Sequence, residues 1–135
     1  KVHATIIEHV VRIIKNISFK NSFDTASESF TSIELEVVQD ADRLDAIGAI
    51  GIARCFNYGG FKNRALYDPK IIPDLKMTKE TYKKSTAPTI NHFYEKLLLL
   101  KDQMNTASGK KIANNRHQFM ELYLQQFYDE WNGKK

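Results

Sequence analysis

The sequence predicts an all-α fold of about four long helices and one long loop. Apolar residues recur at steps of three and four over residues 2–17, 33–57, 89–104 and 110–131, a spacing typical of helices that bury one face. All three prolines fall within residues 69–88, between the second and third of these stretches. With 135 residues and 42% hydrophobic content, the chain has the size and the apolar side chains for one domain with a core.

The first expected helix covers residues 2–17 and carries a wide apolar stripe. Many of its residues are β-branched, so a strand is the alternative, but apolar pairs at steps of three and four favour the helix. Residues 18–31 are rich in Ser, Asn, Thr and Asp, which predicts a loop. Three aromatic residues are expected to anchor this loop to the core: Phe19, Phe23 and Phe30.

The second expected helix runs from Ile33 to Asn57. A hydroxyl residue before it, Thr31 or Ser32, can cap its first turn, where glutamates follow. The glycine pair at 59–60 is expected to end it, because glycine is the residue most often found just past a helix C-terminus.

Residues 39–54 are the most informative part of this helix. Asp42 and Asp45 share one face, and apolar residues precede them, so we expect a buried helix that offers a carboxylate to a polar pocket. A charged group in such a place must be paired, protonated or bound to a metal. The alternative is an acidic helix start, which the helix dipole favours. A glycine in a helix costs about 1 kcal/mol relative to alanine. We therefore expect Gly48 and Gly51 to be present because a neighbouring part of the protein comes close to the backbone there.

The remainder of the chain predicts one long loop and two more helices. Residues 61–87 are irregular, as in functional lids or flexible segments, with one short helical turn at 78–82. Helices are expected over 89–104 and 110–131, and the short connection at 105–109 predicts that they are antiparallel neighbours. The cap candidates are the two hydroxyl residues of that connection, Thr106 and Ser108.

Charge and cysteine content narrow the function. The net charge of +4 comes without a long block of like charge, so nucleic acid is not expected as a partner, and a small phosphorylated molecule fits equally well. The single cysteine, Cys55, excludes an internal disulfide, fits a reducing compartment and predicts a cytoplasmic protein; we expect it in the core rather than as a nucleophile. No apolar run has membrane length, so no membrane partner is expected, and a homo-oligomer is left open.

Two groups of basic and polar residues can face the acidic helix. One is Lys62 and Arg64 after the glycine pair, and the other is His92 and Lys96, which are four apart on one helix face. A carboxylate that holds a divalent cation, beside cations that meet phosphate oxygens, is the combination that phosphoryl transfer requires. The alternative is that Lys96 is a solvated lysine and His92 an interface histidine.

Three motifs in order resemble a known family. Residues 40–51 (DADRLDAIGAIG) resemble the last motif helix of HD-domain metal-dependent phosphohydrolases, nearest to the small bacterial subgroup related to the YedJ and YpgQ proteins. Residues 92–106 look like the next motif of that subgroup, and residues 116–131 look like its closing helix. Residues 67–69 match the family's loop, so the resemblance runs over nearly the whole chain.

The resemblance implies an HD-domain-like helical bundle with a divalent metal ion (Mn, Ni, Mg, Fe, Co or Zn) and a nucleotide or related phosphate ester as substrate. The metal is held by a first His, an adjacent His-Asp pair and a final Asp, and only the final Asp maps here, to Asp42. Arg43 falls where relatives place a cation near the substrate phosphate. Asp45 is expected to orient these groups as a second member of the catalytic site. The weaker candidates for substrate contacts are His92, Lys96 and Arg64.

The sequence departs from the family pattern in one respect. No His-Asp dipeptide occurs, because its four histidines are followed by Ala, Val, Phe and Gln. We therefore expect residues 1–135 to be a single, N-terminally incomplete HD-like domain whose three other ligands lie upstream of Lys1. Such a chain would be inactive unless another chain or segment completed the site. The alternative function is a non-catalytic helical module that binds a partner or a nucleotide.

Overall fold

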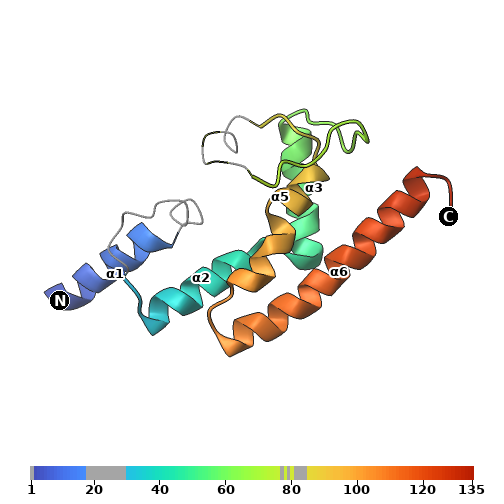
Figure 1. The fold of residues 1–135 in the computed structure, drawn as a ribbon. Coiled ribbons are helices and arrows are strands. Elements are labelled where there is room, and N and C mark those ends of the chain that lie inside the picture. Colours follow the sequence, from blue (N-terminus) through green and yellow to red (C-terminus); the bar gives the residue numbers. More distant parts are fainter. Residues whose placement is uncertain (1, 18–29, 77, 79, 81–84) are drawn as a thin grey trace.

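The computed structural model describes residues 2–17, 30–76, 78, 80 and 85–135, and within them every regular element is helical, as the sequence predicts. Figure 1 shows how the helices of these described residues are arranged. In chain order these are α1 (Ala4–Asn16), α2 (Ile33–Asp45), α3 (Gly48–Phe61), α5 (Asn91–Glu95), the 3-10 helix η2 (Leu97–Gln103) and α6 (Ala107–Trp131). Across the described residues, no helix combines the length and the apolar character that crossing a membrane requires.

The hydrophobic core lies where α3, α5 and η2 meet the long helix α6. Figure 1 shows α6 running past α2 and α3, and α6 contacts both of them as well as η2. The rings of Phe93 and Tyr123 stack with centroids 6.2 Å apart, so Tyr123 of α6 packs against the core, whereas Phe119 and Trp131 of the same helix are exposed. The buried apolar side chains of this core cluster are Ile47, Ile52, Ile90, Phe93, Leu97, Leu100, Met104, Ala113, Met120 and Leu124.

Helix α1 forms as predicted, but its apolar stripe is exposed. None of its residues is buried, and Ile14, for example, is 64% exposed. Its described contacts with α2 include a 3.3 Å contact between Nε2 of His9 and a carboxylate oxygen of Glu34 and a hydrogen bond from Gln39 to the carbonyl of Asn16. Polar contacts therefore contribute to the attachment of α1 to α2.

Two predicted segments lie wholly or largely outside the described residues. The first is the loop at 18–29, which includes Phe19 and Phe23, whereas Phe30 packs against the ring of His9. The second is the helical turn at 78–82, of which only residues 78 and 80 are described. The described part of the long segment between α3 and α5 is otherwise irregular, as expected.

The predicted helix over residues 33–57 is wrong as a single element, because it breaks at Ala46 and Ile47. Gly48 has a φ of +76°, a left-handed conformation that glycine adopts without steric cost, and it begins α3 in a new direction. Gly51 has no side chain, which leaves room for the carbonyl of Ala46. The expected close approach to the backbone at Gly48 and Gly51 is confirmed, and it occurs at a helix break.

The glycine pair at 59–60 does not end the helix. Helix α3 continues through both glycines to Phe61, and Asn63 follows with a left-handed φ of 51°. Gly59 is buried against the side chain of Thr89, so it serves close packing between α3 and the residues before α5. Sequence spacing alone could not distinguish a packing glycine from a terminating one.

The predicted helix over residues 89–104 is also divided. Lys96 leaves helical geometry, with φ −146° and ψ −58°, and separates α5 from η2. Phe93 before the break and Leu97 after it are both buried. The backbone thus changes geometry at Lys96, between two residues whose side chains both lie in the core.

The predicted helix caps are confirmed at Ser32 and at Thr106. Ser32 accepts a 3.2 Å hydrogen bond from the backbone N–H of Leu35, and Thr106 accepts one of 2.9 Å from Gly109. Each hydroxyl satisfies one of the backbone donors that a helix leaves open at its N-terminus. Helix α6 accordingly starts at Ala107, three residues before the predicted start.

Candidate functional site

The three carboxylates of residues 40–45 have different environments. Asp40 is 3% exposed, whereas Asp42 and Asp45 are both exposed. The expectation that Asp42 and Asp45 occupy a buried helix interior is therefore wrong for these residues. Helix α2 turns Asp40 toward α6, and the two candidate catalytic carboxylates lie on its solvent side.

Asp40 is held by the start of helix α6. Its Oδ1 accepts a 2.8 Å hydrogen bond from the N–H of Asn105, and its Oδ2 accepts bonds of 2.8 and 2.7 Å from the N–H and hydroxyl of Thr106. Burial alone would raise the pKa of Asp40. The hydrogen bonds from Asn105 and Thr106, together with the charge of Arg43, have the larger effect, so the pKa is lowered. Asp40 is therefore an ionised carboxylate that joins α2 to α6.

Arg43 faces Asp40 and does not join the other candidate substrate contacts. Its Nη1 lies 3.6 Å from Oδ1 of Asp40, and its side chain is 15% exposed. Asp45 pairs instead with Arg54 of helix α3, whose Nη1 also donates a 3.1 Å hydrogen bond to the Asp45 carbonyl. The candidate residues of α2 thus divide between the α2–α6 junction and the α2–α3 corner.

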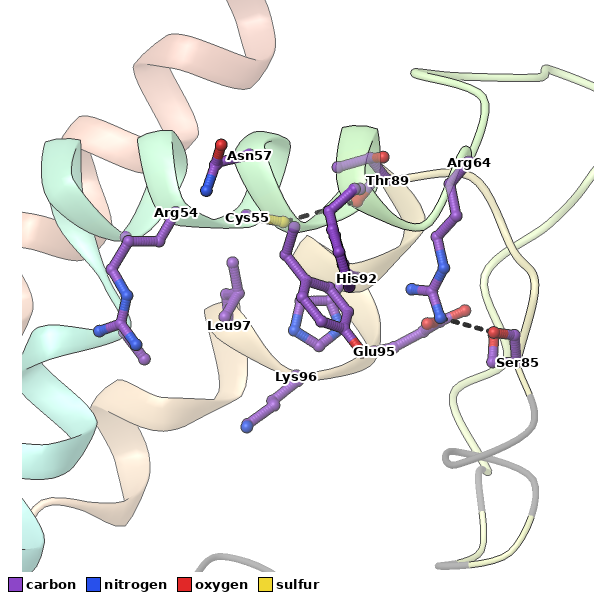
Figure 2. A pocket seen from close by; sticks show the side chains of 15 residues that line it. Arg54, Cys55, Asn57, Arg64, Ser85, Thr89, His92, Glu95, Lys96 and Leu97 are labelled. Carbon is purple, nitrogen blue, oxygen red and sulfur yellow. Dashed lines mark hydrogen bonds between the residues drawn. The ribbon is translucent and has the colours of Figure 1, made fainter.

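A pocket of about 920 Å³ lies between α3, α5 and the segment that joins them, as Figure 2 shows. It brings together three residues that the sequence analysis named as candidate substrate contacts: Arg64, His92 and Lys96. Asp42, Arg43 and Asp45 are not among its lining residues. The full lining is Ala46, Gly51, Arg54, Cys55, Asn57, Tyr58, Gly59, Phe61, Arg64, Ser85, Thr89, His92, Glu95, Lys96 and Leu97.

Sequence reasoning did not identify Arg54 as a pocket residue. It is the only cation in the glycine-rich helix α3, and that isolation is a signal that could have found it. Figure 2 shows Arg54 and Arg64 toward opposite ends of the pocket, with the ring of His92 between them and Lys96 beside it. The pocket therefore has positive charge along its length.

His92 is neutral near pH 7. Burial lowers its pKa to about 4, and the positive charges of Lys96 and Arg64 contribute to the same shift. A neutral imidazole offers one nitrogen as a donor and the other as an acceptor. His92 can therefore hydrogen-bond a ligand at physiological pH without adding charge.

Glu95 is the acidic residue of the pocket lining. Its Oε1 accepts a 3.2 Å hydrogen bond from the backbone N–H of Asp74. Burial raises the pKa of Glu95, and the nearby carboxylate of Asp74 also raises it, while the hydrogen bond from the Asp74 N–H and the charge of Arg64 oppose the shift. Arg64 donates a 2.6 Å hydrogen bond to the carbonyl of Ser85, which connects the two ends of the long segment. These contacts give the pocket polar groups on α5 and on the segment before it.

Cys55 packs against the core, as predicted, and also lines the pocket. Burial raises the pKa of its thiol to about 11, although Arg64 opposes the shift. The thiolate is the reactive form of cysteine, so a thiol with this pKa is a poor nucleophile near pH 7.

The described residues alone do not fit a divalent metal ion. Within residues 2–17, 30–76, 78, 80 and 85–135, no group of three or more His, Cys, Asp or Glu side chains is arranged to hold one. Asp42 offers a single exposed carboxylate, and protein-bound cations take several ligands. A metal at Asp42 would need ligands from beyond these residues.

The sequence is similar to a longer bacterial protein. It is 41% identical over 119 residues to YpgQ of Bacillus subtilis, an alignment that covers 88% of this chain and 50% of YpgQ. The chain thus spans about half the length of the curated relative that it matches. No family model matches the chain.

Solved structures show the same fold. A protein of Lactobacillus plantarum is 45% identical, with a TM-score of 0.85 over 98% of this chain and 61% of its own. An HD-superfamily hydrolase of Bacillus thuringiensis is 47% identical, with a TM-score of 0.72 over 97% of this chain and 56% of its own. Bacillus subtilis YpgQ in complex with ADP is 36% identical, with a TM-score of 0.71 over 96% of this chain and 54% of its own. This chain is therefore a homologue of YpgQ and of an HD-superfamily hydrolase, and its helical fold is HD-domain-like.

Proposed function

We propose that this chain is part of a metal-dependent phosphohydrolase that acts on nucleotides or related phosphate esters. The observation that carries the proposal is the pocket that gathers Arg64, His92 and Lys96, which the sequence analysis named as weaker candidates for substrate contacts. The similarity to an HD-superfamily hydrolase supports the class of reaction. The complex of YpgQ with ADP supports a nucleotide as the ligand.

The pocket residues suit a phosphate group. Arginine and lysine side chains make charge-assisted hydrogen bonds to phosphate oxygens, and neutral His92 adds a donor or an acceptor without further charge. Fixed positive groups also stabilise negative charge that develops on the phosphoryl oxygens during hydrolysis. We assign Lys96 and Arg64 to charge neutralisation and His92 to orientation of the bound phosphate. Arg43 is a weaker candidate because it is paired with Asp40.

We further propose that Asp42 is one ligand of the divalent metal on which HD-superfamily hydrolases depend. When bound, such an ion lowers the pKa of a water molecule and supplies a nucleophile near neutral pH. Because the described residues alone do not fit the ion, the other ligands are proposed to come from outside them. Asp45, three residues on and on the same helix, would orient neighbouring groups.

A second candidate is a nucleotide-binding module without turnover. Its support is that the cations of the pocket all belong to described residues, so binding alone requires no metal ligands from elsewhere. The two candidates differ in two measurable properties, phosphate release and the uptake of a transition metal.

The test combines binding and turnover in the complete protein of which this chain is proposed to be part. ADP affinity is measured by calorimetry, and phosphate release from nucleotides is measured with manganese, nickel or magnesium. Lys96→Gln and Arg64→Gln are each expected to weaken ADP binding about tenfold, the effect of one lost charge-assisted hydrogen bond. Lys101→Gln, on η2 and not lining the pocket, is the control with the same charge change.

Four outcomes are informative. Metal-stimulated phosphate release that Asp42→Ala abolishes supports the hydrolase. Release that survives Asp42→Ala contradicts the metal assignment. ADP binding without phosphate release and without metal uptake favours the binding module, and the absence of ADP binding rejects the pocket for both.

A further inference from the structure

Arg54 connects the acidic end of α2 to the pocket. Its Nη1 makes an ion pair with Oδ2 of Asp45 and donates a 3.1 Å hydrogen bond to the Asp45 carbonyl, the last residue of α2. Arg54 also lines the pocket together with His92 and Lys96. The side chain of Arg54 therefore contacts Asp45, one of the two candidate catalytic carboxylates, and also lines the candidate phosphate site.

The break between α2 and α3 creates this arrangement. In one continuous helix, residues 45 and 54 would be nine positions apart, about 13 Å along the axis and beyond direct pairing. Because the chain turns at Ala46 and Ile47, α3 brings Arg54 back to the end of α2. The corner at 46–47 thus fixes the position of a pocket cation.

The pair contributes little to holding the fold together. The side chains of Arg54 and Asp45 are 60% and 63% exposed, and exposed ion pairs add little to stability. A guanidinium carries five N–H donors, and among the described residues the hydrogen bonds of Arg54 use Nη1 alone. Donors on its other nitrogens remain for a ligand in the pocket.

We infer that Arg54 is a further phosphate-binding residue of this pocket and that Asp45 is its positioning residue. The inference rests on the proposed function, and it adds a contact at the end of the pocket away from Arg64, as seen in Figure 2. The two hydrogen bonds that Arg54 donates to Asp45 restrict the guanidinium, so less conformational freedom is lost when a phosphate binds. The role is distinct from that of Lys96, whose ammonium is a compact point charge on a flexible stem.

The experiment is a double-mutant cycle on ligand affinity. Dissociation constants for ADP, and for inorganic pyrophosphate as a probe without a base, are measured for the unchanged chain, Arg54→Gln, Asp45→Asn and the double variant. Arg54→Gln is expected to weaken both ligands about tenfold. Asp45→Asn is expected to weaken them about threefold alone and to add nothing in the Arg54→Gln background.

The sign of the Asp45→Asn effect distinguishes positioning from simple electrostatics. Removing a negative charge near an anion site strengthens anion binding if charge alone acts, whereas loss of positioning weakens it. Asp102→Asn is the control, because Asp102 is an exposed acid paired with Lys101 and does not line the pocket. Unfolding midpoints close to that of the unchanged chain establish that each variant is folded.

The outcomes also distinguish this inference from the proposed function. If Lys96→Gln weakens ADP binding and Arg54→Gln does not, the inference is overturned and the proposed function stands. If Asp45→Asn strengthens binding, or its effect persists in the double variant, the positioning role is overturned. If the unchanged chain binds neither probe, both are overturned.

Discussion

The carboxylate Oδ2 of Asp40 lies 2.8 Å from the backbone nitrogen of Thr106, although 66 residues separate them in the chain. The hydrogen bond joins the third turn of α2 to the start of α6. The positive end of the α6 dipole and the ionised carboxylate attract each other in the protein interior. This contact helps to set where α6 begins and how it meets α2.

Replacing Asp40 with alanine is expected to destabilise the protein strongly. The change leaves the backbone N–H of Asn105 and the N–H and hydroxyl of Thr106 without their acceptor, so we expect a loss of about 2–4 kcal/mol in the free energy of unfolding. Urea denaturation measures it. The exposed neighbour provides the control, because Asp42→Ala should change the free energy by less than about 0.5 kcal/mol. Equal losses in the two variants would contradict this account.

Gly59→Ala should destabilise the protein, and Gly60→Ala should not. A Cβ at 59 would overlap the side chain of Thr89, whereas a Cβ at 60 meets nothing within 4 Å. We expect a loss of about 1–3 kcal/mol at 59 from overpacking. At 60 we expect a gain of about 0.5–1 kcal/mol, because alanine is favoured over glycine in a helix. Thermal and urea unfolding of the two variants decide the matter, and similar effects at both positions would count against it.

His92 is expected to make stability depend on pH between 6.5 and 4. Its pKa is lowered from 6.5 to about 4 in the folded state, so the unfolded chain binds the proton more readily in that range. The contribution of neutral His92 to the free energy of unfolding is fully present above pH 6.5. It is lost as the pH falls toward 4, by up to about 3 kcal/mol. Unfolding at several pH values, compared with His92→Gln, isolates this contribution. A variant with the same pH slope as the unchanged chain would refute the assignment.

Cys55 is expected to react slowly with alkylating reagents. With a pKa of about 11, the fraction of thiolate at pH 8 is about two orders of magnitude below that of an ordinary cysteine. Because the chain has a single cysteine, mass spectrometry reports its rate without ambiguity. The rate should increase about tenfold per pH unit up to pH 10. A rate that is half-maximal near pH 8.5 and level above about pH 9.5 would show an ordinary thiol.

The helices were predictable because their apolar spacing is local. The periods around Ile6 and Met120, and the caps at Ser32 and Thr106, depend on neighbours within a few residues. The break at residues 46–47 was not predictable from the period, because the same small residues fit a continuous helix. A positive φ at Gly48 depends on packing that includes Arg116 of α6, 2.9 Å from where a Cβ would lie.

The candidate site was predictable only in part. The sequence named His92, Lys96 and Arg64 as candidate substrate contacts, and all three line one pocket, although Lys96 lies just past the end of α5. The choice of which carboxylate is buried could not be made from local sequence. Asp40 turns inward because it accepts hydrogen bonds from Asn105 and Thr106. These partners are 65 and 66 positions away in the chain, so the residues around Asp40 do not reveal them. The roles of Asp42 and Asp45 in catalysis stay predictions.

Gly109 lies in the first turn of α6, where a methyl group would overlap the carboxylate of Asp40. The acid and the missing side chain therefore form a matched pair across two helices. A larger residue at 109 would be tolerated only if position 40 became smaller or α6 moved outward. During divergence, these two positions should consequently change together, and exchanging one of them between relatives should be harmful where exchanging both is not.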